Sequence, residues 1–228
     1  MRTLIDIEDA ERRREELAQL IGASDFPCVG AKSALARGQL KTLACHSLDS
    51  GWDDIRIHSE LLDWVKAYRA DPAGLRSLAI IFEGPVDLDE VAFEQLMWER
   101  LQSLADKDEW RGQALDRKVS GDPSDPHFAL SFGGEGFFVV GLHPNASRPA
   151  RRSPRPTLVF NLHDQFERLR AEGIYEGMRK KIIERDVALA GSPNPMLERF
   201  GEASAANQYS GRAVGEEWRC PFHDPRAR

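Results

Sequence analysis

The feature that most constrains the fold is the stretch from residue 137 to residue 170, FFVVGLHPNASRPARRSPRPTLVFNLHDQFERLR. Two short apolar runs, residues 137–142 and 157–162, are of the kind that forms strands. The loop between them holds four prolines, which cannot donate a backbone hydrogen bond and therefore resist both helix and central strand. The stretch predicts a strand, an ordered but irregular loop, a second strand and a helix.

This loop also carries the residues that point to a binding site. His143 directly follows the first strand, and His163 directly follows the second. If the strands are neighbours with a suitable relative direction, both imidazoles can reach one site. Four arginines lie between the histidines: Arg148, Arg151, Arg152 and Arg155. A surface loop with solvated arginines is the simpler interpretation, but the paired histidines beside concentrated positive charge favour a site for an anionic ligand or a metal ion.

Composition and charge restrict the class of protein. A chain of 228 residues suits one domain, and such a chain can bury about 70% of its unfolded surface. The net charge of −6 argues against nucleic acid as a partner, so the local arginines suit a small anion better. A charged N-terminus and the lack of a run of ~20 apolar residues predict neither a signal peptide nor a membrane segment. Three cysteines form no disulfide framework, and we expect a cytoplasmic protein.

The periodicity of apolar residues predicts the remaining elements. Helices are predicted over residues 9–20, 31–38, 53–70, 89–104, 164–170 and 175–190. Strands are predicted over residues 40–48, 77–83, 128–132, 137–142 and 157–162, with a Gly-Gly turn at 133–134 joining the third and fourth. The expected fold class is α+β, a single domain over residues 1–228 with a mixed or antiparallel sheet of about four to six strands covered by helices. Residues 1–22 hold the N-terminal helix, and residues 223–228 are expected to form a frayed tail.

Four motifs, in their order along the chain, resemble the YqcI/YcgG family. They are HPNASRPARR, PTLVFNLHDQFERLR, NPMLERFGEASAANQYSGR and a terminal WRCPF, and the similarity extends from residue 26 to residue 222. The family includes haem-dependent guanidino and amine N-hydroxylases. The resemblance implies haem b as the cofactor, a small guanidine or amine of amino-acid type as the substrate, and O₂ and an external electron donor as further partners. A homodimer is left open.

The resemblance also gives the histidines and arginines a role. Haem iron takes an axial donor such as neutral imidazole, and the planar fork of arginine suits a haem propionate. His143 is the first choice for the axial ligand, and His163 is the alternative. Arg148, Arg151 and Arg152 are expected to hold the propionates.

A cationic substrate calls for a carboxylate or an aromatic face in the pocket. Glu202 and Glu167 are the candidate carboxylates, with Asp164 beside them, and Tyr209 is the candidate aromatic residue. The polar segment 201–212 lacks an apolar period, and its similarity to the family motif implies that it closes a pocket.

Three other functions remain open at this point. The protein could bind haem as a carrier or gas sensor without catalysis. It could be a non-haem metal enzyme, because the two histidines above and a carboxylate such as Glu167 or Asp164 have the composition of a two-histidine, one-carboxylate site. A cysteine hydrolase using Cys28 or Cys220 is the weakest alternative, since no paired base is evident.

Overall fold

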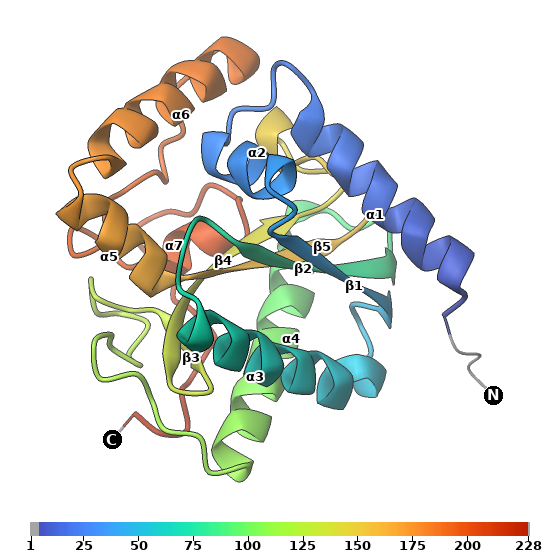
Figure 1. The fold of residues 1–228 in the computed structure, drawn as a ribbon, viewed down its shortest axis with the longest axis vertical. Helices are drawn as coiled ribbons and strands as arrows, with labels where there is room; N and C mark the ends of the chain where they lie inside the picture. Colours follow the sequence, from blue (N-terminus) through green and yellow to red (C-terminus); the bar gives the residue numbers. More distant parts are fainter. Residues whose placement is uncertain (1–4, 228) are drawn as a thin grey trace.

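A five-stranded sheet in the order β1-β2-β5-β4-β3 forms the centre of the molecule (Figure 1). The computed structural model describes residues 5–227. Strands β1 and β2 are parallel, and every other neighbouring pair is antiparallel. The predicted α+β class with a mixed sheet covered by helices is confirmed. The strands are β1 Leu40–Ser47, β2 Ser77–Gly84, β3 Leu130–Phe132, β4 Glu135–Leu142 and β5 Thr157–Leu162.

The helices lie close to the ranges predicted from the apolar periodicity. Side chains at the N-terminal ends of some helices act as caps. The Asp89 carboxylate accepts the backbone N–H of Ala92 at the start of α4, which satisfies one of the free donors of a helix N-terminus. Helix α4 continues past the predicted end at residue 104, because Ala105 and Asp108 are buried on its inner side. The helices are α1 Ile7–Gly22, α2 Val29–Ala36, α3 Asp54–Ala70, α4 Glu90–Trp110, α5 His163–Ala171, α6 Tyr175–Ala190 and α7 Ala206–Tyr209.

The two faces of the sheet are covered differently. Side chains alternate between the faces along each strand, and the apolar strands supply large residues to both. Helices α3 and α4 pack on one face and build the larger core, whereas α1 and α2 lie on the other (Figure 1). The first core contains Leu61, Trp64, Met97, Leu101 and Phe160; the second contains Leu17, Ile21, Phe26, Ala79 and Ile81.

The β3–β4 hairpin turns at the predicted Gly-Gly pair. Gly133 and Gly134 have φ angles of 59° and 78°. A type I′ turn requires positive φ at both central residues, and glycine adopts it without steric cost. The turn therefore explains why two glycines stand between these strands.

The C-terminal segment differs from the frayed tail predicted for residues 223–228. Phe222 lies in the larger core, and Asp224 is 1% exposed. Arg226 forms ion pairs with Asp108 of α4 and with Asp224, and it donates a 2.8 Å hydrogen bond to the carbonyl of Ser131. Residues 223–227 are thus anchored by a buried carboxylate whose burial could not be read from a polar stretch of sequence.

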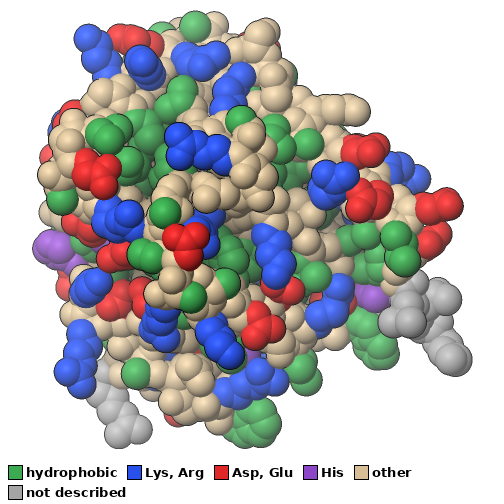
Figure 2. Space-filling model, viewed as in Figure 1, with side chains coloured by type: hydrophobic (Ala, Val, Ile, Leu, Met, Phe, Trp, Pro, Cys, Tyr) green, Lys and Arg blue, Asp and Glu red, His purple; other side chains and the backbone are tan. Residues whose placement is uncertain are grey.

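Charge is mixed on the surface of the molecule. Figure 2 shows Lys and Arg side chains interspersed with Asp and Glu over the face in view, and neither sign dominates that face. Within residues 5–227, no helix combines the length and the hydropathy that a membrane crossing requires.

Candidate functional site

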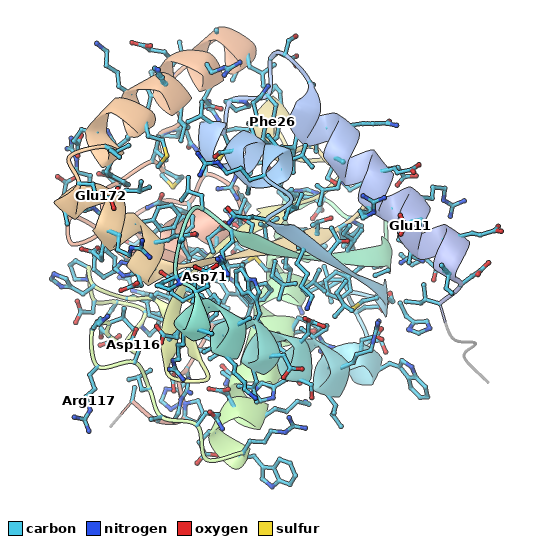
Figure 3. The ribbon with its side chains drawn as sticks, viewed as in Figure 1. Glu11, Phe26, Asp71, Asp116, Arg117 and Glu172 are labelled. Atoms are coloured by element: carbon cyan, nitrogen blue, oxygen red, sulfur yellow. The ribbon has the colours of Figure 1, made fainter. Side chains whose placement is uncertain are left out.

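A cavity of about 310 Å³ lies between the sheet and the helices on its second face. Phe138 and Val140 of β4 line its floor, and Met178 and Ile182 of α6 line the opposite side. Phe26, labelled in Figure 3 in the connection from α1 to α2, adds an aromatic wall. Ligand sites are typically mostly apolar cavities of about 300–1,000 Å³, so this cavity can hold a small molecule.

The polar segment 201–212 forms part of the cavity wall. Ala203, Ala205 and Gln208 line the cavity, and the hydroxyl of Ser204 donates a 2.7 Å hydrogen bond to the carbonyl of Pro123. A segment without an apolar period is therefore held in place by polar contacts and placed against the cavity.

His163 is the histidine that lines the cavity. It is the first residue of α5 and follows β5 directly, so strand alternation places it on the same face as Asn161. The residue is 7% exposed, its ring centroid lies 4.1 Å from that of Phe200, and its Nε2 has no hydrogen-bond partner among residues 5–227. The nearest carboxylate oxygen, of Glu167, is 3.6 Å from Nε2, beyond hydrogen-bond distance. Burial lowers the pKa of His163, which favours the neutral imidazole.

His143 lies elsewhere. Strands β4 and β5 are antiparallel, with Leu142 paired to Thr157 and Phe137 paired to Leu162. Their C-terminal ends are therefore at opposite ends of the pair, roughly 20 Å apart at about 3.3 Å per residue. The ring of His143 stacks on Phe93 of α4 at 4.3 Å, on the other side of the sheet. The expectation that both imidazoles reach one site fails, because the two strands run in opposite directions.

The three arginines predicted to bind propionates all have protein partners. Arg148 pairs with Asp186 of α6. Arg151 donates to three backbone carbonyls, one at the end of β4 and two in the α7 segment, over 3.0–3.2 Å. Arg152 donates to two carbonyls within its own loop, over 2.8 and 3.0 Å. Arg148 and Arg151 line the cavity, and Arg152 does not.

The cavity carries positive charge that the protein does not neutralise. Four arginines line it, and two of them have carboxylate partners. The other two, Arg151 and Arg179, make no ion pair within residues 5–227 and donate only to backbone carbonyls. Burial lowers the pKa of Arg151 to about 10, and the nearby Asp186 carboxylate, which forms no ion pair with it, raises this pKa by less. An anionic ligand would neutralise these two groups.

A model of the YqcI/YcgG family matches residues 17–223. The chain belongs to the YqcI/YcgG family. Every residue that lines the cavity falls within the matched range, so the cavity belongs to the part of the chain that defines membership of the YqcI/YcgG family. No curated protein and no solved structure matches the chain.

The two glutamates predicted for the site of this YqcI/YcgG family member do not line the cavity. Glu202 is exposed and pairs with Arg199 at 3.4 Å. Glu167 lies one helical turn beyond His163 and pairs with Arg170. Their carboxylates therefore face partners on the surface of the molecule.

Tyr209 and Asp164 are also engaged elsewhere. Tyr209 is fully buried on the α4 side, stacks on Trp98, and donates a 3.0 Å hydrogen bond to the carbonyl of Phe137. Burial raises the pKa of its hydroxyl. Asp164 accepts a 2.8 Å hydrogen bond from the hydroxyl of Tyr68. Both side chains therefore connect elements of the fold and do not face the cavity.

A cysteine hydrolase needs a thiol with a lowered pKa, and a non-haem metal enzyme needs several ligand side chains close together. Cys28 lines the cavity as the N-cap of α2, but burial raises the pKa of its thiol, and burial raises that of Cys220 to about 12. Within the described residues, no three His, Cys, Asp or Glu side chains gather closely enough to hold a metal ion. The two-histidine constellation is not assembled, because His143 and His163 lie at opposite ends of their strands.

Sequence reasoning missed the polar side chains next to His163. Asn161 and Gln165 line the cavity. The hydroxyl of Ser77 donates to the Asn161 carbonyl at 2.7 Å, and Arg76 N–H donates to the Gln165 side-chain carbonyl at 3.0 Å. Strand alternation offered a signal for Asn161, because position 161 in β5 and position 163 directly after the strand are two residues apart and fall on the same side of the sheet.

Proposed function

We propose that this YqcI/YcgG family member binds haem b in the cavity and hydroxylates a guanidino or amino nitrogen of a small, amino-acid-like substrate. The observation that carries the proposal is the imidazole of His163. It lines a largely apolar cavity, it is buried, and no group in the described part of the chain bonds to its Nε2. A neutral imidazole with a free nitrogen is the form that ligates haem iron.

The other residues of the cavity fit the same cofactor. Phe138 and Val140 present apolar surface that suits the faces of a porphyrin. Arg151 and Arg179 lack carboxylate partners within residues 5–227, and two propionates would supply them. His163 would therefore be the residue that ligates the iron, in place of His143, whose ring stacks on Phe93 away from the cavity.

Bound haem would supply the reductive activation of O₂ that the reaction requires. In the overall reaction, one oxygen atom converts a substrate N–H into N–OH, and the other leaves as water. The two electrons and two protons that balance the reaction come from an external donor. The residues of the cavity would hold this group, with His163 as the ligand of the iron and Arg151 and Arg179 as partners of the propionates, and the apolar walls would exclude water.

Replacement of His163 tests the assignment of the axial ligand. In protein expressed with a haem precursor, His163→Ala should lose most of its haem or shift its Soret band. Added imidazole should restore the spectrum by taking the vacated position. His143→Ala and His46→Ala serve as controls and should keep the wild-type haem content per folded protein. A wild-type spectrum for His163→Ala would rule out this ligand.

Product analysis tests catalysis separately from haem binding. The haem-loaded protein, a reductant and isotopically labelled O₂ are incubated with arginine, other guanidines and amines, and the products are analysed by mass spectrometry. The proposal predicts a product that carries one labelled oxygen on nitrogen. Stoichiometric haem with no such product from any of these compounds would instead favour a carrier or gas sensor.

A further inference from the structure

Two carboxylates among the described residues line the cavity, Asp186 and Glu198. They differ in burial, because Asp186 is 7% exposed whereas Glu198 is exposed to solvent. Asp186 belongs to the inner side of α6, on the stripe that includes Met178 and Ile182. Residues three to four positions apart share a helix face, so α6 presents this carboxylate to the cavity together with its apolar residues.

The partner of Asp186 uses only part of the carboxylate. An Nη2–H of Arg148 donates to Oδ2, and Oδ1 accepts no hydrogen bond from residues 5–227. The rest of the guanidinium is directed elsewhere, since it also donates to the carbonyls of Ser192 and Pro193 over 3.0 and 3.4 Å. A bidentate arginine pair would occupy both oxygens. The geometry therefore leaves one oxygen of a buried carboxylate for a second donor.

A cationic group of a ligand requires a carboxylate oxygen without another donor, like Oδ1 of Asp186, when it enters an apolar cavity. A charge that leaves water for an apolar cavity is costly unless a counter-ion receives it. The glutamates that the sequence suggested, Glu202 and Glu167, do not line the cavity and have arginine partners. Once cofactor carboxylates face the two unpaired arginines, Asp186 is the enclosed anionic group that remains.

We propose that Asp186 receives the cationic guanidinium or ammonium group of the substrate through Oδ1, with Arg148 fixing the carboxylate through Oδ2. The inference rests on the proposed function, and it identifies Asp186 as the residue that selects a charged nitrogen over a neutral one. It also explains why a buried ion pair lines an otherwise apolar wall.

Calorimetric titration of the haem-loaded protein with n-butylguanidine and n-butylurea tests the proposal, because these probes have the same shape and differ in charge. The wild type should bind the guanidine about 10-fold or more tightly than the urea. Asp186→Asn should reduce this ratio to near 1 while leaving affinity for the urea similar. Asp186→Glu should keep a preference, and Glu198→Gln, the matched control at the exposed carboxylate, should keep the full ratio.

The double variant Arg148→Met, Asp186→Leu keeps the proposal testable if Asp186→Asn does not fold, because replacement of a whole buried ion pair by apolar residues is often tolerated. This variant should also lose the preference for the guanidine. An unchanged ratio in either folded variant, loss of the ratio in Glu198→Gln, or a wild type without the preference would overturn the proposal. Haem content reports on the proposed function independently, since Asp186→Asn should keep the wild-type Soret band.

Discussion

Within the range 5–227 that the structure describes, three buried histidines, His58, His143 and His163, each carry a ring nitrogen without a hydrogen-bond partner. Only His163 among them lines the cavity. His58 bonds through its other nitrogen to Asp108 at 2.6 Å, and His143 stacks on Phe93. A free ring nitrogen becomes a candidate ligand only where there is space for a metal-bearing group, and this distinguishes His163 from the other two.

His143 should make stability depend on pH. Burial lowers its pKa in the folded state, and the nearby Glu90 and Asp89 carboxylates raise it by less. Below about pH 6.5 the unfolded chain therefore binds a proton that the folded protein does not, and stability falls as pH falls. Between pH 8 and pH 6 the free energy of unfolding should therefore fall, and one histidine with an ordinary pKa of about 6.5 in the unfolded chain can contribute at most roughly 0.8 kcal/mol to this fall.

Urea denaturation of wild type and His143→Gln at both pH values measures this contribution. The variant should lose less stability than the wild type over the interval. His127→Gln, at an exposed side chain, should follow the wild type. Parallel curves for His143→Gln and wild type would show that His143 does not carry this pH dependence.

Gly141 is required by close packing. A Cβ at this position would lie 2.8 Å from the ring of Phe93 and 2.9 Å from the carbonyl oxygen of Tyr209. Gly141→Ala should therefore cost about 1–3 kcal/mol through overpacking. Gly177→Ala, inside α6 where a Cβ meets nothing within 4 Å, should instead be neutral or stabilise by about 0.5–1 kcal/mol. Thermal or urea unfolding measures the stability of each variant relative to the wild type. Equal stabilities of the two variants would contradict the packing argument.

At the scale of elements, the C-terminal segment is tied to α4 at two buried carboxylates. Glu94 accepts hydrogen bonds from Arg212 and from the indole N–H of Trp218. Asp108, further along the same helix, pairs with Arg226. Residues 210–227, which follow α7 and hold no helix or strand, thus gain a fixed path along α4. The segment before them, from Ala203 to Gln208, lines the cavity.

Removal of Arg226 should destabilise the fold strongly. Its side chain is 8% exposed, and its loss would leave Asp108 and Asp224 without their cation. Breaking a buried pair in this way costs about 3–5 kcal/mol. Arg226→Ala should show this loss in urea unfolding, whereas Arg219→Ala, on the exposed part of the segment, should stay within about 0.5 kcal/mol of wild type. A near-neutral Arg226→Ala would mean that the tail contributes little to stability.

The sequence predicts the elements better than their arrangement. Apolar runs identify all five strands, and residues 133–134 identify the hairpin, because these signals are local. The direction and order of the strands depend on long-range pairing: β5 inserts between β2 and β4, which no local pattern reveals. For the same reason, His143 and His163 look equivalent in the sequence and lie at opposite ends of an antiparallel pair.

The partners of charged residues are hidden from the sequence as well. Arg148 and Asp186 lie on different elements, and only the packing of α6 over the cavity brings them together. Asp108 and Arg226 are likewise far apart along the chain. The sequence therefore points to the β5–α5 junction and to segment 201–212, which both line the cavity, but it does not point to Asp186.

At the scale of the whole molecule, the two faces of the sheet have different roles. Aromatic side chains from the strands pack against α3 and α4 into a continuous core. On the other face, residues of α1, α2, α5 and α6 line a cavity, and Asp186 is the one buried residue of α6. The stretch from residue 137 to residue 170 runs through the centre of this arrangement and supplies the cavity floor, three of the four arginines that line the cavity among residues 5–227, and His163.

The absorption spectrum of the protein, expressed with a haem precursor and recorded as purified and after addition of dithionite and CO, tests haem binding most directly. A Soret band at near-stoichiometric haem, shifted by CO, is the expected result. A colourless protein that takes up no haem on reconstitution would contradict the assignment of the cavity to this cofactor.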